Sequence, residues 1–318
     1  MASSKWPKNS LKKITFSTHK IKASSFPKSS LEIINSLNRN GFQAYLVGGC
    51  IRDKLLKITP KDFDISTNAT PEQIKRILPR SRIIGRRFKL VHVRKGREII
   101  EVSTFRSLDN SNVQNHEGMI LKDNIYGTSL EDALRRDLTI NALFYDVETQ
   151  EILDFTSGYS DVMEGRIRVI GDIEKRFKED PIRMLRAIRF SSKLRLKLED
   201  SIIIKIKELG HLLLNIPSAR RLDEVNKLFL NGYALHNFKL LIDLDLLKYL
   251  FPLLKDDSLK KQHQMSVFLD ISFKNTDHRV KKNKPVMISF LMAAILWPSL
   301  IEKIGEVASP SMKIYDIR

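Results

Sequence analysis

The stretch spanning residues 48–65, GGCIRDKLLKITPKDFDI, restricts the fold of this chain more than any other part of its sequence. The run QAYLV before it predicts a strand, and the glycine pair ends that strand and opens a short helix over CIRDKLLK. The segment DFDIST predicts a second strand, in which Asp62 and Asp64 share one face because side chains alternate along a strand. Glycines at a strand-to-helix turn, an arginine and a D-x-D pair together indicate a site for phosphate and a divalent metal ion.

The two aspartates predict a metal site because neighbouring carboxylates repel one another unless a cation lies between them. Mg²⁺ prefers oxygen ligands and is usually held by one or two carboxylates together with substrate phosphates. A pair of such ions could activate a hydroxyl group and stabilise a leaving pyrophosphate. A third carboxylate would complete the site, and the candidates are Glu101 in EIIEVSTF and Asp137 in LRRDLTIN. Both could instead form ordinary salt bridges.

The charge balance favours a polyanionic partner. The chain has 55 Lys and Arg against 37 Asp and Glu, a net charge of +18 and an isoelectric point near 9.8, which favours nucleic acid over a membrane surface. The single cysteine, Cys50, excludes a disulfide framework and a cysteine-based zinc site. No apolar run reaches the roughly 18 residues of a membrane span, and the longest, residues 286–297, predicts a buried helix. We therefore expect a cytoplasmic protein without a membrane segment.

The sequence predicts four parts along the chain. Residues 1–28 hold seven lysines and no acidic residue, so we expect 1–27 to be a basic, disordered arm. Strand and helix patterns alternate over 28–170, whereas Leu and Ile recur at helical spacing afterwards. We therefore expect a helical part over 171–270 and a further helical C-terminal segment over 271–318.

Local signals set the ends of several elements in the first of these structured parts. Thr70 and Pro71 open a helix as its cap and first residue. The runs KLVHVRKG and REIIEVSTFR predict a hairpin with a Lys-Gly turn. Residues 107–127 are polar and predict a long mobile loop, and SLEDALRR begins a capped helix.

Four segments in this order, YLVGGCIRDKLL, KDFDISTNATPEQI, RRDLTIN and EDPIRMLRAIRF, resemble the class II tRNA nucleotidyltransferase and bacterial poly(A) polymerase family over residues 38–255. The resemblance implies an α+β fold: a polymerase-β-like nucleotidyltransferase head, with a mixed sheet plus helices, followed by an all-α neck and body. It also implies that the helical part over 171–270 binds nucleotide and RNA, and that the segment over 271–318 is shortened. The segments IIGRRFKLVHV and LEDALRRDLTINALFYD resemble the poly(A) polymerase branch more than CCA-adding enzymes, so the Gly85-Arg86-Arg87-Phe88 stretch is the discriminating feature.

The resemblance also implies roles for individual residues. Asp62 and Asp64 would bind two Mg²⁺ ions, Asp137 occupies a further acidic position of the family, and Glu101 matches a strand carboxylate. In EDPIRMLR, an aspartate precedes a proline, a good helix start, and in the family the matching Asp and Arg side chains read the incoming base. The residues implied at the nucleotide are Gly48, Gly49, Arg52, Arg135, Arg136, Asn141, Asp180, Arg183 and Arg186.

The implied activity is template-independent transfer of AMP from ATP to RNA 3′ ends with release of pyrophosphate, a tailing reaction that marks RNA for decay. Two alternatives stay open: a CCA-adding tRNA nucleotidyltransferase, which would use CTP as well, and an inactive RNA-binding protein. The sequence indicates no particular protein partner. It departs from the family at Leu138, where phenylalanine is common, and in its final residues, where we expect the usual basic extension to be missing.

Overall fold

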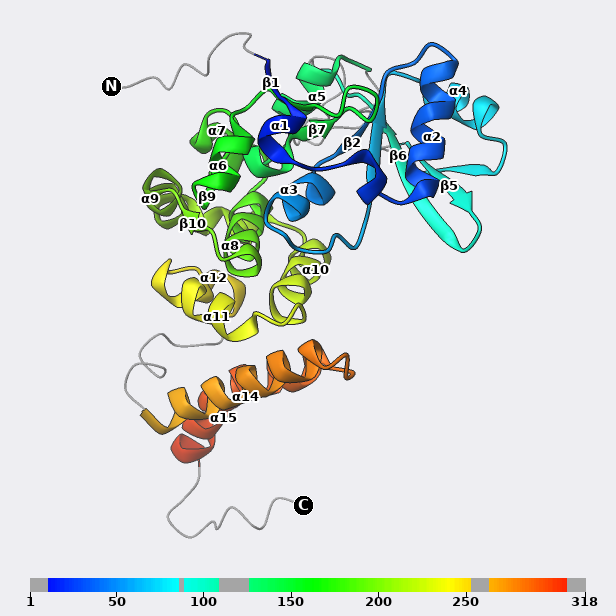
Figure 1. The fold of residues 1–318 in the computed structure, drawn as a ribbon. Helices are drawn as coiled ribbons and strands as arrows, with labels where there is room; N and C mark the ends of the chain where they lie inside the picture. The colour runs from blue at the N-terminus through cyan, green and yellow to red at the C-terminus, as the bar shows by residue number, and fades with distance from the viewer. Residues whose placement is uncertain (1–10, 86–88, 109–125, 253–262, 308–318) are drawn as a thin grey trace. The chain divides into compact units, whose positions relative to one another are not determined.

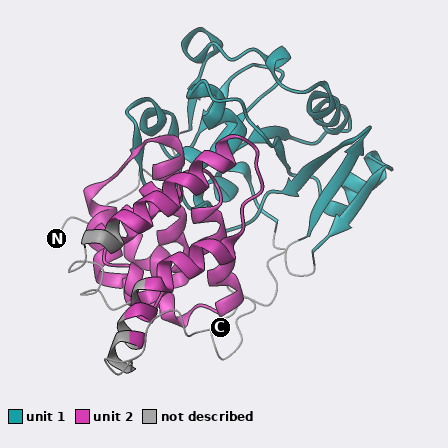
Figure 2. Cartoon of the chain, turned by 90° about the horizontal axis from the view of Figure 1, so that it is seen from below, with its two compact units in different colours: residues 1–172 teal, residues 173–318 magenta. Residues whose placement is uncertain are grey.

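The computed structural model describes residues 11–85, 89–108, 126–252 and 263–307 of the chain, which divides into two compact units, residues 1–172 and 173–318 (Figure 2). Residues 86–88 of the discriminating GRRF stretch, and most of the predicted loop over 107–127, lie outside the described residues. In the described ranges, no helix has both the length and the apolar character needed to cross a membrane.

The first unit contains, in its described part, an eight-stranded mixed sheet with the order β1-β8-β7-β2-β3-β6-β5-β4. Neighbouring strands are antiparallel, except that β3 and β6 run parallel. The strands are β1 (Lys12–Ile14), β2 (Ala44–Val47), β3 (Asp64–Thr67), β4 (Ser81–Ile84), β5 (Leu90–Lys95), β6 (Glu98–Thr104), β7 (Leu143–Tyr145) and β8 (Ile152–Asp154).

Two helices of this unit begin where their capping residues predict. Thr70 and Gln73 form a reciprocal capping box with Pro71 in the first turn, and Thr128 caps the helix that begins at Ser129 in the same way. The predicted hairpin is also confirmed, with Gly96 at positive φ in its turn. The helices are α1 (Phe16–His19), η1 (Ala23–Ser25), α2 (Lys28–Arg39), α3 (Gly49–Leu55), α4 (Pro71–Ile77), α5 (Ser129–Arg135), η2 (Thr139–Asn141) and α6 (Gly158–Met163), followed by the short strand β9 (Arg166–Ile167).

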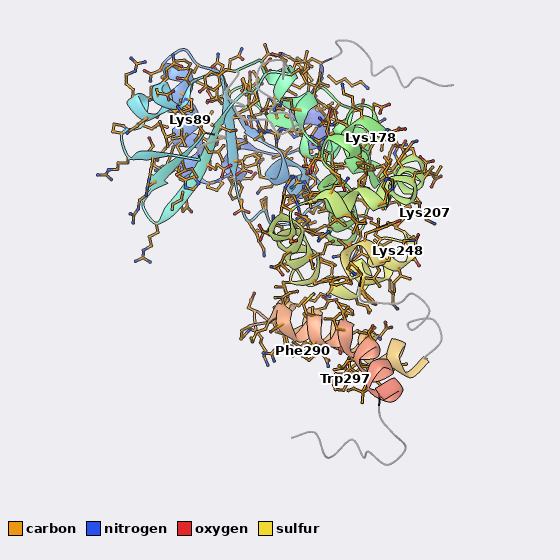
Figure 3. The ribbon with its side chains drawn as sticks, turned by 180° about the vertical axis from the view of Figure 1, so that it is seen from behind. Lys89, Lys178, Lys207, Lys248, Phe290 and Trp297 are labelled. Atoms are coloured by element: carbon orange, nitrogen blue, oxygen red, sulfur yellow. The ribbon has the colours of Figure 1, made fainter. Side chains whose placement is uncertain are left out.

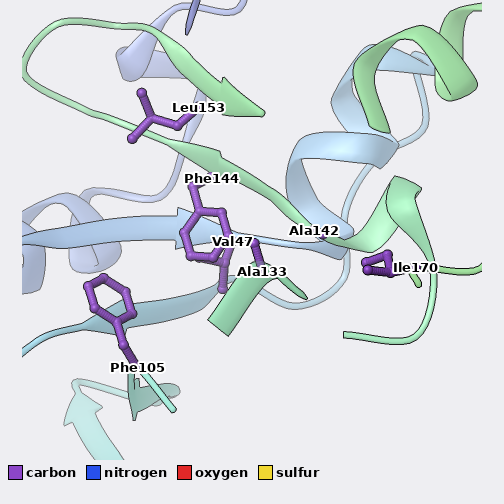
Figure 4. Close-up of a cluster of buried hydrophobic side chains, with 7 residues drawn as sticks. All are labelled: Val47, Phe105, Ala133, Ala142, Phe144, Leu153 and Ile170. Atoms are coloured by element: carbon purple, nitrogen blue, oxygen red, sulfur yellow. The ribbon is translucent and has the colours of Figure 1, made fainter. Parts of the chain in front are cut away.

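One face of the sheet is covered by helices along its length. The alternating residues Val91, Val93 and Ile100 are buried on this face, where α2 packs on β2 and β3 and α4 packs on β4 and β5 (Figure 1). Part of the opposite face is covered by an apolar cluster (Figure 4). Its buried members are Val47, Phe105, Ala133, Ala142, Phe144, Leu153 and Ile170.

The N-terminal segment corrects one prediction. We expected residues 1–27 to be a disordered arm, but 11–27 are folded: β1 pairs with β8, and Tyr145 Oη donates a hydrogen bond to the Ile21 carbonyl at 3.0 Å. The prediction of disorder was based on the lysine content, but the lysines of an edge strand can point into solvent while its backbone pairs with the sheet. The apolar residues Ile21 and Phe26 are buried and hold the segment in place.

One local prediction is also corrected in this unit. The strand predicted over DFDIST begins only at Asp64, so Asp62 precedes it and does not share its pleat. The segment GYSDVM forms α6, because the Asp154 carboxylate accepts hydrogen bonds from the backbone N–H groups of Thr156, Gly158 and Tyr159 and so organises the start of the helix.

The second unit confirms the predicted helical neck and body, with one two-residue strand, β10 (Lys197–Leu198), among its described elements. The predicted boundary between residues 270 and 271 falls inside a helix, so the four-part division stays a prediction. The helices are α7 (Ile173–Glu179), α8 (Ile182–Leu194), α9 (Asp200–Leu209), η3 (Gly210–Asn215), α10 (Ser218–Phe229), α11 (Ala234–Asp243), α12 (Leu247–Leu250), α14 (His263–Lys281) and α15 (Ile288–Val307).

The helix predicted over residues 286–297 is only half buried. Leu291 and Ile295 are fully buried where α15 packs against α14, whereas Phe290 is 54% exposed and Trp297 45% exposed (Figure 3). A helix that is apolar all round predicts burial on all sides, so the prediction is wrong for the outer face of this helix.

Candidate active site

The glycine pair forms a turn whose first residue, Gly48, has a backbone conformation that favours glycine. Gly48 has φ +70° and ψ −120°, and a Cβ atom there would lie 3.1 Å from Nη1 of Arg136. A Cβ atom on Gly49 would lie 3.4 Å from Nη2 of Arg52. Two guanidinium groups therefore flank the backbone of this turn. Since α3 is short, these arginines, more than a helix dipole, make the turn attractive to an anion.

Arg52 is almost fully buried and its donors meet protein acceptors. Its Nε and Nη2 donate to Oδ1 of Asp53 at 2.8 and 2.6 Å, and its Nη1 donates to Oδ1 of Asn141. A buried cation requires such partners. The structure thus shows Arg52 joining α3 to η2, and brings the predicted residues Arg52 and Asn141 together. Its contact with a triphosphate stays a prediction.

Arg136, at the end of α5, is held beside the glycine turn from three sides. Its Nη2 donates to Oδ2 of Asp132 at 2.9 Å, its Nη1 donates to the Asn141 carbonyl at 3.1 Å, and its guanidinium lies over the Phe144 ring. Our sequence reasoning missed the buried Asp132. The spacing of four residues between Asp132 and Arg136 on a predicted helix was the signal that could have found it.

Three carboxylates gather at the start of β3. The parallel pairing of β3 with β6 places Asp64 beside Glu101 on one face of the sheet. Asp64 is exposed to solvent, but the protein atoms around its carboxyl desolvate it enough to raise the pKa to about 6, and the negative charges of Glu101 and Asp62 raise it as well. The Arg136 guanidinium opposes this rise. Three carboxylates that repel one another therefore lie near one cation, Arg136.

This acidic group fits a divalent cation by its chemistry. Within the described residues, no three His, Cys, Asp or Glu side chains already lie close enough to form a metal cage. Desolvation and the neighbouring acids nevertheless raise the pKa of Asp64 in spite of Arg136, so a further cation at this position would stabilise its charged form. All the donors are carboxylate oxygens, the ligands that Mg²⁺ prefers, with substrate phosphates expected to supply the others.

Asp137 and Arg135 bind local backbone groups instead. Oδ1 of Asp137 accepts a hydrogen bond from the Leu138 N–H at 2.9 Å, and Arg135 Nη1 donates to the Ser107 carbonyl at 2.6 Å. The R-R-D sequence therefore sends its three side chains to different neighbours, and Arg136 is the member that interacts with Asp64.

The second unit places the predicted base-reading residues around the start of α8. Helix α8 begins at Ile182 with Pro181 as its N-cap residue, one residue later than predicted. Oδ1 of Asp180 accepts from the Ile182 N–H at 3.3 Å, while Oδ2 accepts from Nη2 of Arg220 at 2.7 Å. Arg183 donates to Glu179 at 2.9 Å, and Arg186 lies near the Phe190 ring. Arg220 was missed because forty residues of sequence separate it from its partner.

Comparisons with known proteins match both units. Residues 44–168 match the model of the "Poly A polymerase head domain", and residues 195–258 match "Probable RNA and SrmB- binding site of polymerase A". Poly(A) polymerase I of Haemophilus influenzae is 42% identical over 94% of this chain and 68% of its own length. The CCA-adding enzyme of Bacillus pumilus is 37% identical over 74% of this chain and 58% of its own length.

A solved structure gives the same picture of the fold. The Bacillus stearothermophilus CCA-adding enzyme in complex with CTP matches with a TM-score of 0.66 and 28% identity, over 88% of this chain and 70% of that one. The chain spans 66–68% of the length of the poly(A) polymerases that it resembles in Haemophilus influenzae and in a strain of Escherichia coli.

Proposed function

Because the chain belongs to the family of bacterial poly(A) polymerases and class II tRNA nucleotidyltransferases, we propose that it adds AMP residues from ATP to RNA 3′ ends without a template, a tail that would mark RNA for decay. The observation that carries this proposal is the acidic group of Asp64, Glu101 and Asp62, which lies next to Arg136 and the Gly48 turn. Relatives named poly(A) polymerase share more identity over more of the chain than those named CCA-adding enzyme.

In the proposed reaction the RNA 3′-hydroxyl oxygen forms a bond to the α-phosphorus of ATP, and the bond from that phosphorus to the bridging oxygen of pyrophosphate breaks. Arg136 and the backbone at Gly48 and Gly49 bind the triphosphate. Asp62 and Asp64 would hold two Mg²⁺ ions, which supply Lewis-acid activation of the hydroxyl and neutralise the leaving group. Glu101 or Asp137 orients the attacking hydroxyl, so the protein contributes positioning and charge neutralisation.

Selection of ATP is assigned to the second unit. Asp180 and Arg183 offer an acceptor and a planar donor fork, the groups that read the hydrogen-bonding edge of a base. The contact of Asp180 with Arg220 fixes one of its oxygens, which supports a role for Arg220 in orienting this carboxylate.

The test is one primer-extension experiment with Mg²⁺, ATP or CTP, and two labelled RNAs: an unstructured oligomer and a tRNA lacking its 3′ CCA. We expect a long ladder with ATP on the oligomer. Addition of a few nucleotides to the tRNA alone, with a requirement for CTP, would instead identify a CCA-adding enzyme. Binding of RNA without extension of either substrate would identify an inactive RNA-binding protein.

The matched control is the double variant Asp62→Asn, Asp64→Asn, which keeps the shape of both side chains and removes their charge. We expect it to bind RNA and to give no ladder at any Mg²⁺ concentration. A ladder that survives in this variant, or that persists in the wild type after chelation of divalent ions, would overturn the assigned metal ligands.

A further inference from the structure

A row of polar side chains crosses four strands on one face of the sheet. The register of β3 with β6 places Asp64 beside Glu101, that of β6 with β5 pairs Glu101 with His92, and that of β5 with β4 pairs His92 with Arg82. Nε2 of His92 lies 3.8 Å from Oε2 of Glu101. At about 4.8 Å per strand, the row extends roughly 14 Å from Asp64 to the edge strand. The proposed catalytic carboxylates are therefore the inner end of a longer feature.

The cations on the two faces of these strands differ in their partners. On the helix-covered face, Lys95 pairs with Glu32 of α2 at 3.2 Å and Lys89 pairs with Glu72 of α4 at 3.0 Å. On the opposite face, Arg82 is exposed, and its side chain forms no hydrogen bond or ion pair with any of the described residues. The positive charge of one face is neutralised within the protein, and that of the other face is directed to solvent.

A second arginine extends this open face toward the hairpin turn. Arg94 lies two residues from His92 on β5, so both side chains point to the same side. It is exposed, and its Nε donates to the Gly96 carbonyl at 3.3 Å. Its cross-strand neighbour Ile99 is 64% exposed. Surfaces that bind single-stranded nucleic acid use positively charged side chains that follow its backbone.

We propose that the open face of β4 and β5, with Arg82 and Arg94, is a binding track for the phosphates of the strand whose 3′ end is extended at Asp64. That the strand is RNA rests on the proposed function. The strand order separates this track from the triphosphate: the Gly48 turn follows β2, on one side of β3, while β4 lies three strands away on the other side. The two substrates thus approach Asp64 from opposite directions along the sheet.

The test measures the affinity of the full chain for a 5′-labelled oligoadenylate by fluorescence anisotropy over a series of salt concentrations. The variants are Arg82→Gln, Arg94→Gln and their combination, and the matched control is Arg76→Gln, an equally exposed arginine on α4 at the covered face. Each track arginine should lower the salt slope by about 0.7, and the double variant should weaken binding about tenfold at moderate salt. Arg76→Gln should change neither quantity.

Arg82→Lys keeps the charge and should retain the wild-type slope, which separates a phosphate contact from a structural role, and equal melting temperatures establish folding of every variant. If the KM for ATP rises while RNA affinity is unchanged, the arginines serve the triphosphate and the proposal is overturned. Unchanged slopes also overturn it. If the wild type extends RNA but the slopes do not change, only the track fails. If the slopes change but no RNA is extended, the proposed function fails and the track remains.

Discussion

On one face of the sheet, the two halves carry side chains of different polarity. Over β7, β8 and β2 this face bears Val47, Phe144 and Leu153, all buried in the apolar cluster (Figure 4). From β3 to β4 the same face bears the polar row Asp64, Glu101, His92 and Arg82, beside apolar residues such as the exposed Ile99. The active-site residues therefore begin where the core cluster ends, at the border between β2 and β3. A site placed there gains rigid support on one side and access for substrates on the other.

Helix α5 connects the two halves within one turn. Ala133 is buried in the apolar cluster, whereas Arg136, three residues later, lies beside the Gly48 turn and contacts Phe144 of the cluster. We call the half with the apolar cluster (β7, β8 and β2) the closed half, and the half from β3 to β4 the open half. Packing in the closed half therefore sets the position of the Arg136 charge in the open half. The predictions below separate these two contributions.

The largest effect is expected from Phe144→Ala. Phe144 is fully buried and its ring packs against those of Tyr45, Phe105 and Phe155. Its removal should lower the free energy of unfolding by about 3–5 kcal/mol and, through Arg136, should also raise the KM for ATP. Urea unfolding followed by circular dichroism measures the first effect.

The matched change in the open half is Ile99→Ala, which removes an apolar side chain that is 64% exposed. It should change the free energy of unfolding by no more than about 0.5 kcal/mol. Equal losses for Phe144→Ala and Ile99→Ala would mean that the two halves are equally packed, against the comparison drawn above.

The next effect is expected from Asp64→Asn, which should act on activity and spare stability. Removal of one charged group that stabilises a transition state typically costs about 10²–10³-fold in kcat. Because burial and neighbouring acids raise the pKa of Asp64 to about 6, its charge opposes folding at neutral pH, and the amide should leave the melting temperature equal or higher. A melting temperature several degrees lower would assign Asp64 a structural role.

Much of this molecule could be predicted from sequence because the signals are local. The capping box at Thr70, the hairpin turn at Gly96 and the glycine turn at Gly48 each depend on a few adjacent residues. The gathering of Asp64 and Glu101 was indicated by the kind of residue, a carboxylate in an apolar strand, rather than by spacing. Each of these features is determined by residues within one short segment of the sequence.

What the sequence could not provide depends on pairing between distant segments. The row from Asp64 to Arg82 requires the parallel register of β3 with β6, which no local pattern fixes. The folding of residues 11–27 requires β8 as a partner, and the contact of Asp180 with Arg220 requires two helices to pack. Arg52 was predicted at a phosphate and lies in a buried ion pair, because burial is not visible in the motif.

A smaller effect is expected from Gly48→Ala, compared with Gly96→Ala. Both glycines have positive φ, so alanine is strained at either position. A Cβ atom at Gly48 would also press on the Arg136 guanidinium and the Asn141 carbonyl, whereas at Gly96 it would meet open space. We expect stability losses of about 2–3 kcal/mol for Gly48→Ala and about 1 kcal/mol for Gly96→Ala, with a raised KM for ATP only in the former. A raised KM in both variants would contradict the assigned role of the turn.

The smallest effect is expected from Asp161→Asn, which removes the charge of a buried carboxylate. Asp161 is fully buried, and burial raises its pKa above the ordinary 3.8 in spite of hydrogen bonds from Thr139 and Arg168. A raised folded-state pKa favours the protonated form, so ionisation of Asp161 should cost stability progressively as pH rises from below 3.8 through that pKa. Relative to wild type, Asp161→Asn should therefore gain stability as pH increases from acid to neutral, measured by urea unfolding at several pH values. A relative loss over that range would mean that Arg168 and Arg166 stabilise the charge more than burial opposes it. The closed half would then hold a favourable ion pair, whereas the open half holds carboxylates that repel one another.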